Sequence, residues 1–315
     1  MTAYQWRMPE GPMAEHVRQV AARAAAAVRP YIPKRWRGDL PVVPVVRLTG
    51  VIGFSTPLRP GLSIAGVAKT LDRAFAVRNA KAVALVINSP GGSAVQSHLI
   101  FQRIRALSDE KKVPIIAFVE DVAASGGYMI ACAADEIVCD PASIVGSIGV
   151  IGASFGFPEA MKRFGIERRI YTAGEHKSML DPFLPEQEED VARLKAIQRD
   201  IHDMFIGLVR ARRGARLAGP ENTMFSGEYW VAKTAKEFGL IDQIGDVRSF
   251  LRQRFGEDVV MPPIASERSL FGRRTPGVTG VSPERILDGV IDRASLVDDI
   301  ISAIETRAIW ARFGL

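Results

Sequence analysis

Residues 83–93, Val-Ala-Leu-Val-Ile-Asn-Ser-Pro-Gly-Gly-Ser, begin with an apolar run and end in a Pro-Gly-Gly turn. An apolar run that stops at such a turn, before an amphipathic segment, predicts a buried strand followed by the start of a helix. The glycines also let backbone amides face a bound molecule, because no Cβ stands in the way. Apolar strands of this kind alternate along the chain with helix-length amphipathic segments, which indicates an α/β fold.

The pattern of apolar and polar residues predicts strands and helices along the whole chain. It predicts strands near 42–49, 82–88, 114–119, 136–138, 147–154 and 167–173. It predicts helices near 63–78, 93–108, 126–134, 158–164, 186–213, 229–238 and 246–255. With 315 residues and 47% hydrophobic content, the chain can bury a substantial core, either as one domain with extensions or as two smaller domains.

Ser125 is the candidate nucleophile. It follows the strand-like stretch 113–119 and precedes two glycines and an apolar, helix-like segment. A hydroxyl at the start of a helix lies near unpaired amides and a positive dipole, which favour the oxyanion formed when a serine attacks a carbonyl. Without other evidence, a serine in this position is more often a helix cap. A catalytic serine would also need an adjacent base.

Lys177, within Gly-Glu-His-Lys-Ser at 174–178, is the candidate base. A lysine acts as a base only if burial lowers its pKa from about 10.4 to about 7 or 8, and we expect Lys177 at a strand end among apolar residues. A lone lysine is usually a solvated surface charge. His176 is an alternative, since histidine titrates near neutrality, but neighbours in an extended segment face opposite sides. We expect His16, His98 and His202 on helices far from these motifs.

Five motifs occur in one order along residues 42–256. They are Asn-Ser-Pro-Gly-Gly at 88–92, Ala-Ser-Gly-Gly-Tyr at 124–128, Gly-Ser-Ile-Gly-Val at 146–150, the 174–178 motif, and Phe-Ser-Gly at 225–227 continuing to Gly-Leu-Ile-Asp-Gln-Ile-Gly at 239–245. In these motifs the chain resembles the signal-peptide peptidase A group of serine peptidases, family S49. The resemblance implies a spiral of ββα units like that of the caseinolytic protease and crotonase superfamily.

The resemblance also implies roles for individual residues. Ser125 would be the nucleophile and Lys177, rather than His176, the general base, while the Ser147 hydroxyl would orient the Lys177 amine. The amides of Gly92 and Gly126 would form the oxyanion hole. Without the resemblance, Ser147 is as readily a serine whose hydroxyl is satisfied by the backbone. Single-length members of the family form rings or domes with the dyad completed between protomers, so we predict a homo-oligomer in which Lys177 reaches a neighbour's Ser125.

An extended peptide is the expected substrate. The Ile/Val/Gly-rich stretch 144–152 suits a peptide bound as an added strand, with Gly91, Gly149 and Val150 as contacts. The predicted function is a serine endopeptidase that cuts peptides or unfolded segments, signal-peptide remnants among them, through an acyl-enzyme. One alternative is a crotonase-like enzyme acting on acyl thioesters through the same oxyanion hole. Another is a non-catalytic, membrane-associated oligomeric scaffold.

Cysteine and histidine usage points away from metal chemistry. The two cysteines, Cys132 and Cys139, lie in apolar surroundings and are expected to be a reduced, packed pair. No cluster has metal-ligand spacing, so we predict no metal and no cofactor.

The two ends of the chain are predicted extensions of a peptidase domain at 41–256. Residues 1–40 would hold a basic amphipathic helix, near 13–29, that packs in an oligomer or lies on an anionic membrane. Residues 257–281 read as a flexible linker, and 282–315 as an amphipathic helix for which oligomer contact is the favoured role. The net charge of +6 comes with no nucleic-acid motif, so we predict no such partner. Since no long apolar run or secretion signal is found, we expect a cytoplasmic protein with peripheral contact at the inner face of the membrane.

Overall fold

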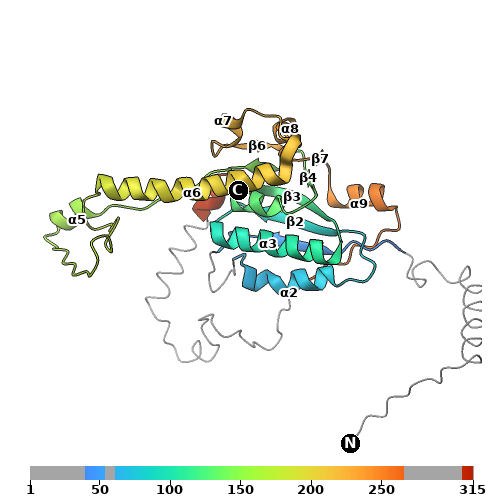
Figure 1. The fold of residues 1–315 in the computed structure, drawn as a ribbon, viewed down its shortest axis with the longest axis horizontal. Coiled ribbons are helices and arrows are strands. Elements are labelled where there is room, and N and C mark those ends of the chain that lie inside the picture. Colours follow the sequence, from blue (N-terminus) through green and yellow to red (C-terminus); the bar gives the residue numbers. More distant parts are fainter. Residues whose placement is uncertain (1–39, 54–60, 266–306, 315) are drawn as a thin grey trace, which may run out of the picture.

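A central β-sheet organises the molecule (Figure 1). The structure is a computed structural model and describes residues 40–53, 61–265 and 307–314. Within them the sheet has seven strands: β1 Val45–Thr49, β2 Val83–Ser89, β3 Ile115–Ala124, β4 Glu136–Cys139, β5 Ile144–Gly146, β6 Tyr229–Val231 and β7 Gln243–Ile244. Strands β1-β2-β3-β4-β7 are neighbours in that order and parallel. β5 pairs with β3 in parallel and with β6 antiparallel.

Strand β3 divides its pairing between two neighbours. Its first half pairs with β4, and its last three residues pair with β5. Its register against β2 shifts between Ile87 and Ser89, which marks a bulge at the change of partner. Ala124 and Gly146 are the last pair of β3 and β5, so the residues that follow them leave the sheet side by side.

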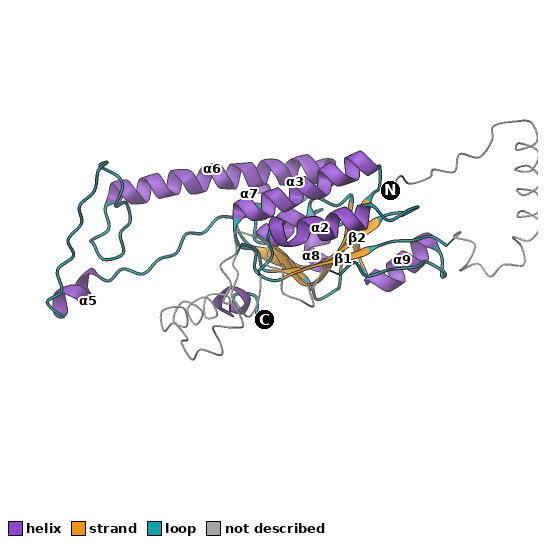
Figure 2. Ribbon diagram, turned by 90° about the horizontal axis from the view of Figure 1, so that it is seen from below, coloured by secondary structure: helices purple, strands orange, loops and turns teal. Residues whose placement is uncertain are grey.

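Helices cover both faces of the sheet (Figure 2). They are α2 Ile64–Phe75, α3 Ala94–Lys111, α4 Gly126–Ala131, α5 Pro158–Arg163, α6 Glu188–Arg213, η3 Gly214–Arg216, α7 Glu221–Met224, α8 Ala232–Glu237 and α9 Val247–Phe255. The larger core joins one sheet face to α2, α3 and α4, whereas α9 packs Phe250 on the opposite face, edge-on to Phe118 of β3. Because β2 is buried on both faces, it reads as a continuous apolar run.

Residues 151–200, which we call the arm, project away from this core (Figures 1 and 2). None of them is buried, and Phe155 and Tyr171 are 81% and 92% exposed. Helix α6 carries the arm: its 26 residues span about 39 Å. Its buried residues, Phe205, Val209 and Arg213, all lie near its carboxyl end.

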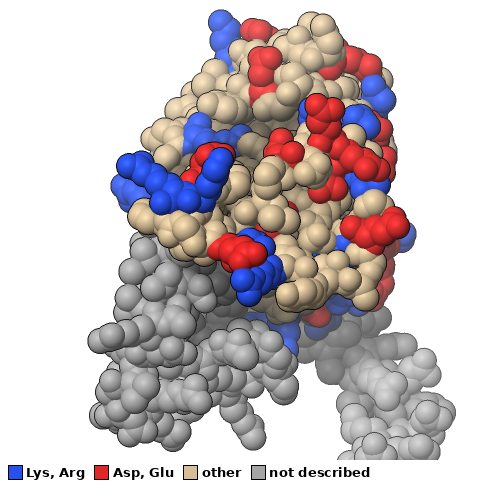
Figure 3. All heavy atoms as spheres, turned by 90° about the vertical axis from the view of Figure 1, so that its left-hand side faces the viewer, with Lys and Arg blue, Asp and Glu red and all other residues tan. Residues whose placement is uncertain are grey.

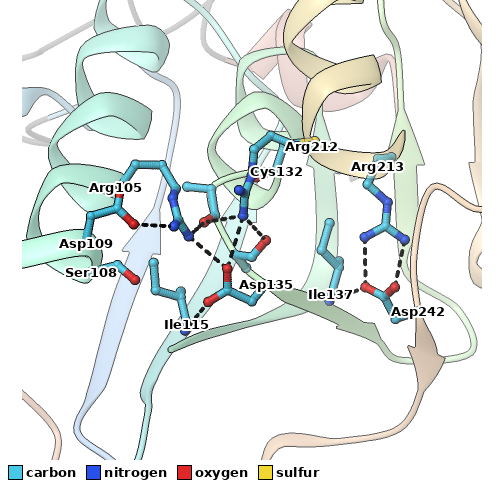
Figure 4. A network of polar contacts seen from close by, with 12 residues as sticks. Arg105, Ser108, Asp109, Ile115, Cys132, Asp135, Ile137, Arg212, Arg213 and Asp242 are labelled. Atoms are coloured by element: carbon cyan, nitrogen blue, oxygen red, sulfur yellow. Dashed lines mark hydrogen bonds and ion pairs between the residues drawn. The ribbon is translucent and has the colours of Figure 1, made fainter. Parts of the chain in front are cut away.

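Ion pairs fix the carboxyl end of α6 to the sheet (Figure 4). Arg213 donates two hydrogen bonds to Asp242, at 2.8 and 2.9 Å, and Asp242 also accepts from the Ile137 amide at 2.7 Å. Burial alone would raise the pKa of Asp242, but the bonds and charge of Arg213 lower it below its usual value. Next to this pair, Arg212 donates to the Cys132 carbonyl at 2.9 Å and contacts Asp135.

The predicted α/β class is confirmed, with a sheet that is parallel except for β6. Two predicted strands are wrong. In place of the strand predicted near 147–154, the structure has β5, which ends at Gly146 because Ser147 has φ +53°, outside the extended region. Residues 167–173 form no strand, since they lie exposed on the arm without a neighbouring strand to pair with. The helix predicted from 229 begins at Ala232, after β6.

The predicted extensions are described in part. Residues 1–39 and 266–306, with most of both predicted terminal helices, lie outside the described residues. Residues 260–264 fall within the predicted flexible linker but are ordered. Their backbone hydrogen bonds to Val43 and Val45 extend the sheet beside β1. At the C-terminal end, Trp310 and Phe313 pack on Val122, Ala124 and Ile144, and the role of the tail in an oligomer contact stays a prediction.

Two further expectations can be compared with the described residues. Cys132 and Cys139 are free and buried, as predicted. Burial raises the pKa of the Cys132 thiol to about 12 and that of Cys139 further. No helix among the described residues is both long and apolar enough to cross a membrane.

Candidate active site

Ser125 lies at the junction of β3 and α4 in a backbone conformation that is rare outside glycine, with φ +52° and ψ −121°. Its amide donates to the Gly146 carbonyl at 2.8 Å, and its carbonyl accepts from Met129 at 3.0 Å. One of these hydrogen bonds goes to β5 and the other comes from α4, and together they hold the strained turn. The Ser125 side chain is half-buried and makes no capping hydrogen bond. The Ser125 side chain therefore does not cap α4.

The Pro-Gly-Gly turn touches Ser125 from the end of β2. A Cβ added to Gly91 would lie 2.8 Å from the Ser125 Cβ and 2.9 Å from the Gly126 nitrogen. Gly92 has φ +141°, and a Cβ there would lie 2.1 Å from the Ile52 carbonyl oxygen. Both positions therefore need glycine. Among the described residues, the amides of Gly92 and Gly126 donate no hydrogen bond.

Ser147 stands beside Ser125, because each follows the last pair of β3 and β5. It is 7% exposed, and its amide donates to the Glu228 carbonyl at 2.6 Å. Its hydroxyl makes no hydrogen bond to the described residues. Gly149 and Val150 follow it half-buried, and a Cβ on Gly149 would lie 3.0 Å from the Gly227 Cα. One protomer thus brings together Ser125, Ser147 and the two glycine amides.

Lys177 does not join this group within one protomer. It lies on the segment between α5 and α6, at the end of α6 that is farthest from the sheet (Figure 1). Its side chain is exposed, and its amide donates to Gly174 at 3.2 Å within a turn. The expectation of a strand end among apolar residues is wrong for the single protomer, because the arm is not packed on the core. Its role as the base stays a prediction.

Two residues near the site were not given a role by the sequence. The buried Ser89 hydroxyl donates to the Gly50 carbonyl at 2.7 Å and accepts from the Gly91 amide at 3.3 Å, which orders the glycine turn. His202 bonds to the Ile148 carbonyl at 2.9 Å, next to Ser147, so the expectation that it lies far from the motifs is wrong. Ser89 lies inside a quoted motif, but nothing in the helical pattern around His202 indicates what it faces. Within the described residues, no cluster of three His, Cys, Asp or Glu side chains suits a metal.

Comparison with known proteins gives matches over most of the chain. The family model of Peptidase family S49 matches residues 107–254, which include Ser125, Ser147 and Lys177. A relative from Brucella abortus titled Na(+)/H(+) antiporter NhaA is 52% identical over 289 residues. That match covers 90% of this chain, which spans 38% of the length of the relative.

Two further matches carry peptidase names. The protein slr0021 of Synechocystis sp., a candidate protease, is 30% identical over 201 residues, or 61% of this chain and 70% of the relative. Among solved structures, a membrane-bound stomatin-specific protease with a bound substrate peptide has a TM-score of 0.44 and 18% identity, over 73% of this chain and 94% of that one.

Proposed function

Because this chain belongs to peptidase family S49, we propose that it is a serine endopeptidase with Ser125 as its nucleophile. The observation that supports this best is the strained Ser125 turn, whose hydroxyl is not used as a cap and which contacts a glycine turn with a free amide. Strained backbone at a strand-to-helix junction persists where the surroundings impose it, and such sites are often functional.

In the proposed reaction, Ser125 Oγ attacks the carbonyl carbon of a peptide bond as the base takes its proton. The amides of Gly92 and Gly126 stabilise the oxyanion, and the proton passes to the leaving amine. The carbonyl re-forms as an acyl-enzyme, which water then attacks with the same base. An extended substrate would lie along Gly149 and Val150, which follow β5 and belong to no strand, while Gly91 contacts it from the other side.

We propose that Lys177 supplies the base from a neighbouring protomer. A lysine acts as a base only where burial favours the neutral amine, and Lys177 is exposed in the single protomer. The arm also exposes large apolar side chains, among them Ile151, Phe155, Phe164, Ile166 and Tyr171. Viewed from the arm end, charged side chains of both signs are interspersed with broad uncharged surface (Figure 3). Large exposed apolar patches mark contacts between protein chains, and in the proposal a second copy buries both these apolar side chains and Lys177.

Two measurements test the nucleophile. A fluorophosphonate probe should label Ser125, as located by mass spectrometry, and Ser125→Ala should lose both labelling and peptide hydrolysis with an unchanged circular dichroism spectrum. A crotonase-like enzyme would not be labelled. Lys177→Ala should also lose hydrolysis, whereas Lys195→Ala, an exposed lysine on α6, should keep it. Hydrolysis that survives in Ser125→Ala or Lys177→Ala would refute the dyad.

Mixing the two inactive variants tests the shared site. If Lys177 comes from a neighbour, a site in a random one-to-one mixture has about a one-half chance of an intact serine and about a one-half chance of an intact lysine. About one quarter of the wild-type rate should therefore return. Mixed oligomers without any activity would show that the dyad lies within one protomer.

For location, we propose peripheral contact with the cytoplasmic face of a membrane. The net charge of +6 favours an anionic surface. Flotation with anionic liposomes, with and without residues 1–37, tests this contact, and equal flotation of the two forms would exclude the N-terminal segment as its source.

A further inference from the structure

The turn that carries Lys177 is held against α6 by polar contacts. His176 Nδ1 lies 2.7 Å from Arg193 Nη1, and the Leu180 amide donates to Asp190 at 3.3 Å. Arg193 is itself oriented by Glu189, one helical turn earlier, and by Asp190 at 3.5 Å. Arg193 and Asp190 of α6 thus bind the short segment that carries Lys177, and Glu189 orients Arg193.

The contact between His176 and Arg193 requires one state of the imidazole. A guanidinium has only N–H donors, so the Nδ1 atom that faces it must offer a lone pair. The contact therefore fits a neutral His176 ring with its proton on Nε2. A protonated ring carries N–H groups on both nitrogens and would set two donors against each other. The contact can exist only while His176 is uncharged.

We propose that neutral His176 is a positioning residue for Lys177, and that its protonation releases the turn. The inference rests on the proposed role of Lys177 as the base. It also gives His176 and Lys177 different roles. The His176 nitrogen that could accept a proton is already bound to Arg193, so it is not available to Ser125.

Other charged groups surround His176. Those that line the same cavity are Glu175 and Asp181 from the loop and Glu186, Glu189, Asp190 and Arg193 from α6 or the residues before it; Lys177 is adjacent in sequence. Of these groups, Arg193 is the one in direct contact with the His176 ring.

The pH profile of hydrolysis tests the proposal. We would measure kcat/KM from about pH 5 to 9 on an internally quenched peptide chosen for cleavage by the full-length protein. Wild type needs both a neutral lysine and a neutral histidine, so log(kcat/KM) should fall toward acid with a slope approaching about two. His176→Asn keeps an acceptor oxygen that does not titrate, and its slope should be about one. A wild-type slope of one that matches His176→Asn would overturn the proposal.

Variants at the contact separate positioning from a general loss of structure. His176→Leu removes the acceptor and should lower kcat by roughly tenfold at pH 9 with little change in KM, since the base is misplaced rather than the substrate lost. Arg193→Met should give the same loss, and the double variant no further loss. Arg199→Met, an exposed arginine on the same helix, is the matched control. Wild-type kcat in His176→Leu would refute the inference.

A spectroscopic measurement does not depend on activity. In ring-¹⁵N-histidine-labelled Ser125→Ala protein at pH 8, the His176 signals should be those of the Nε2–H tautomer, and a proton on Nδ1 would contradict the proposal. Different results would refute the role of Lys177 and the role of His176. Activity retained by Lys177→Ala would refute the proposed base, whereas an inactive Lys177→Ala with equal acid slopes would refute only the role of His176.

Discussion

Replacing Asp242 by Asn should destabilise the protein strongly, because it leaves a buried cation without its partner. The Arg213 side chain is 1% exposed and that of Asp242 is 16% exposed. An amide retains one acceptor oxygen but directs an NH₂ group at the donors of Arg213 and Ile137. Breaking a buried ion pair in this way costs about 3–5 kcal/mol.

The control is a pair of the same type on the surface. Arg210 and Glu221 are 52% and 65% exposed and 2.9 Å apart, so Glu221→Gln should cost about 0–1 kcal/mol. Urea unfolding followed by circular dichroism, at one protein concentration, measures both variants. Equal losses in the two variants, or a loss below about 1 kcal/mol for Asp242→Asn, would refute the reasoning from burial.

The same pair predicts a pH dependence of stability. The folded pKa of Asp242 is lowered, despite the opposing effect of burial, by the bonds and charge of Arg213. Its contribution is therefore present above the unfolded pKa of about 3.9 and is lost as the pH falls toward the lower folded value. Wild type should lose more stability than Asp242→Asn on acidification through this window. Parallel curves for the two proteins would contradict the linkage.

Three further predictions follow from local packing. Gly91→Ala should abolish hydrolysis, because the added Cβ would lie 2.8 Å from that of Ser125, and a fully active Gly91→Ala would contradict this. Gly207→Ala is the control: the glycine lies on the exposed side of α6 with nothing within 4 Å of an added Cβ, so the variant should raise stability by up to about 1 kcal/mol. Phe313→Ala should cost about 3–5 kcal/mol in urea unfolding if the C-terminal packing on Val122 and Ala124 persists in solution, and an unchanged midpoint would show that it does not. Cys132 and Cys139 should resist a thiol reagent in the native protein and react only after unfolding, since burial raises the pKa of both thiols; rapid native labelling would contradict this.

The sequence predicts the elements whose pattern depends only on their own residues. The apolar runs that became β2 and β3 are buried on both faces, and the amphipathic segments that became α2 and α3 lie where they were expected. The short strands β6 and β7 were missed because they consist of three and two residues and depend on pairing with distant segments. The strand predicted near 167–173 had the right composition but no partner in the protomer.

The candidate site divides in the same way. Ser125, Ser147 and the glycine turn converge because each follows a strand of one parallel sheet, which motif order already suggested. Lys177 could not be placed, because its environment is set by how the arm packs rather than by its own segment. His202 was missed since helical periodicity gives the face of a helix and not what lies opposite it.

Because α6 is long and continuous, the proposed pairing between copies of the chain depends on the helical phase of α6. One residue inserted between Arg199 and Phe205 would rotate everything beyond it by about 100° while advancing it only about 1.5 Å. A flexible connector would absorb such an insertion, but a continuous helix passes it on to the turn at its tip. Under the proposed pairing, such an insertion would therefore turn Lys177 away from a neighbour's Ser125 even between identical chains.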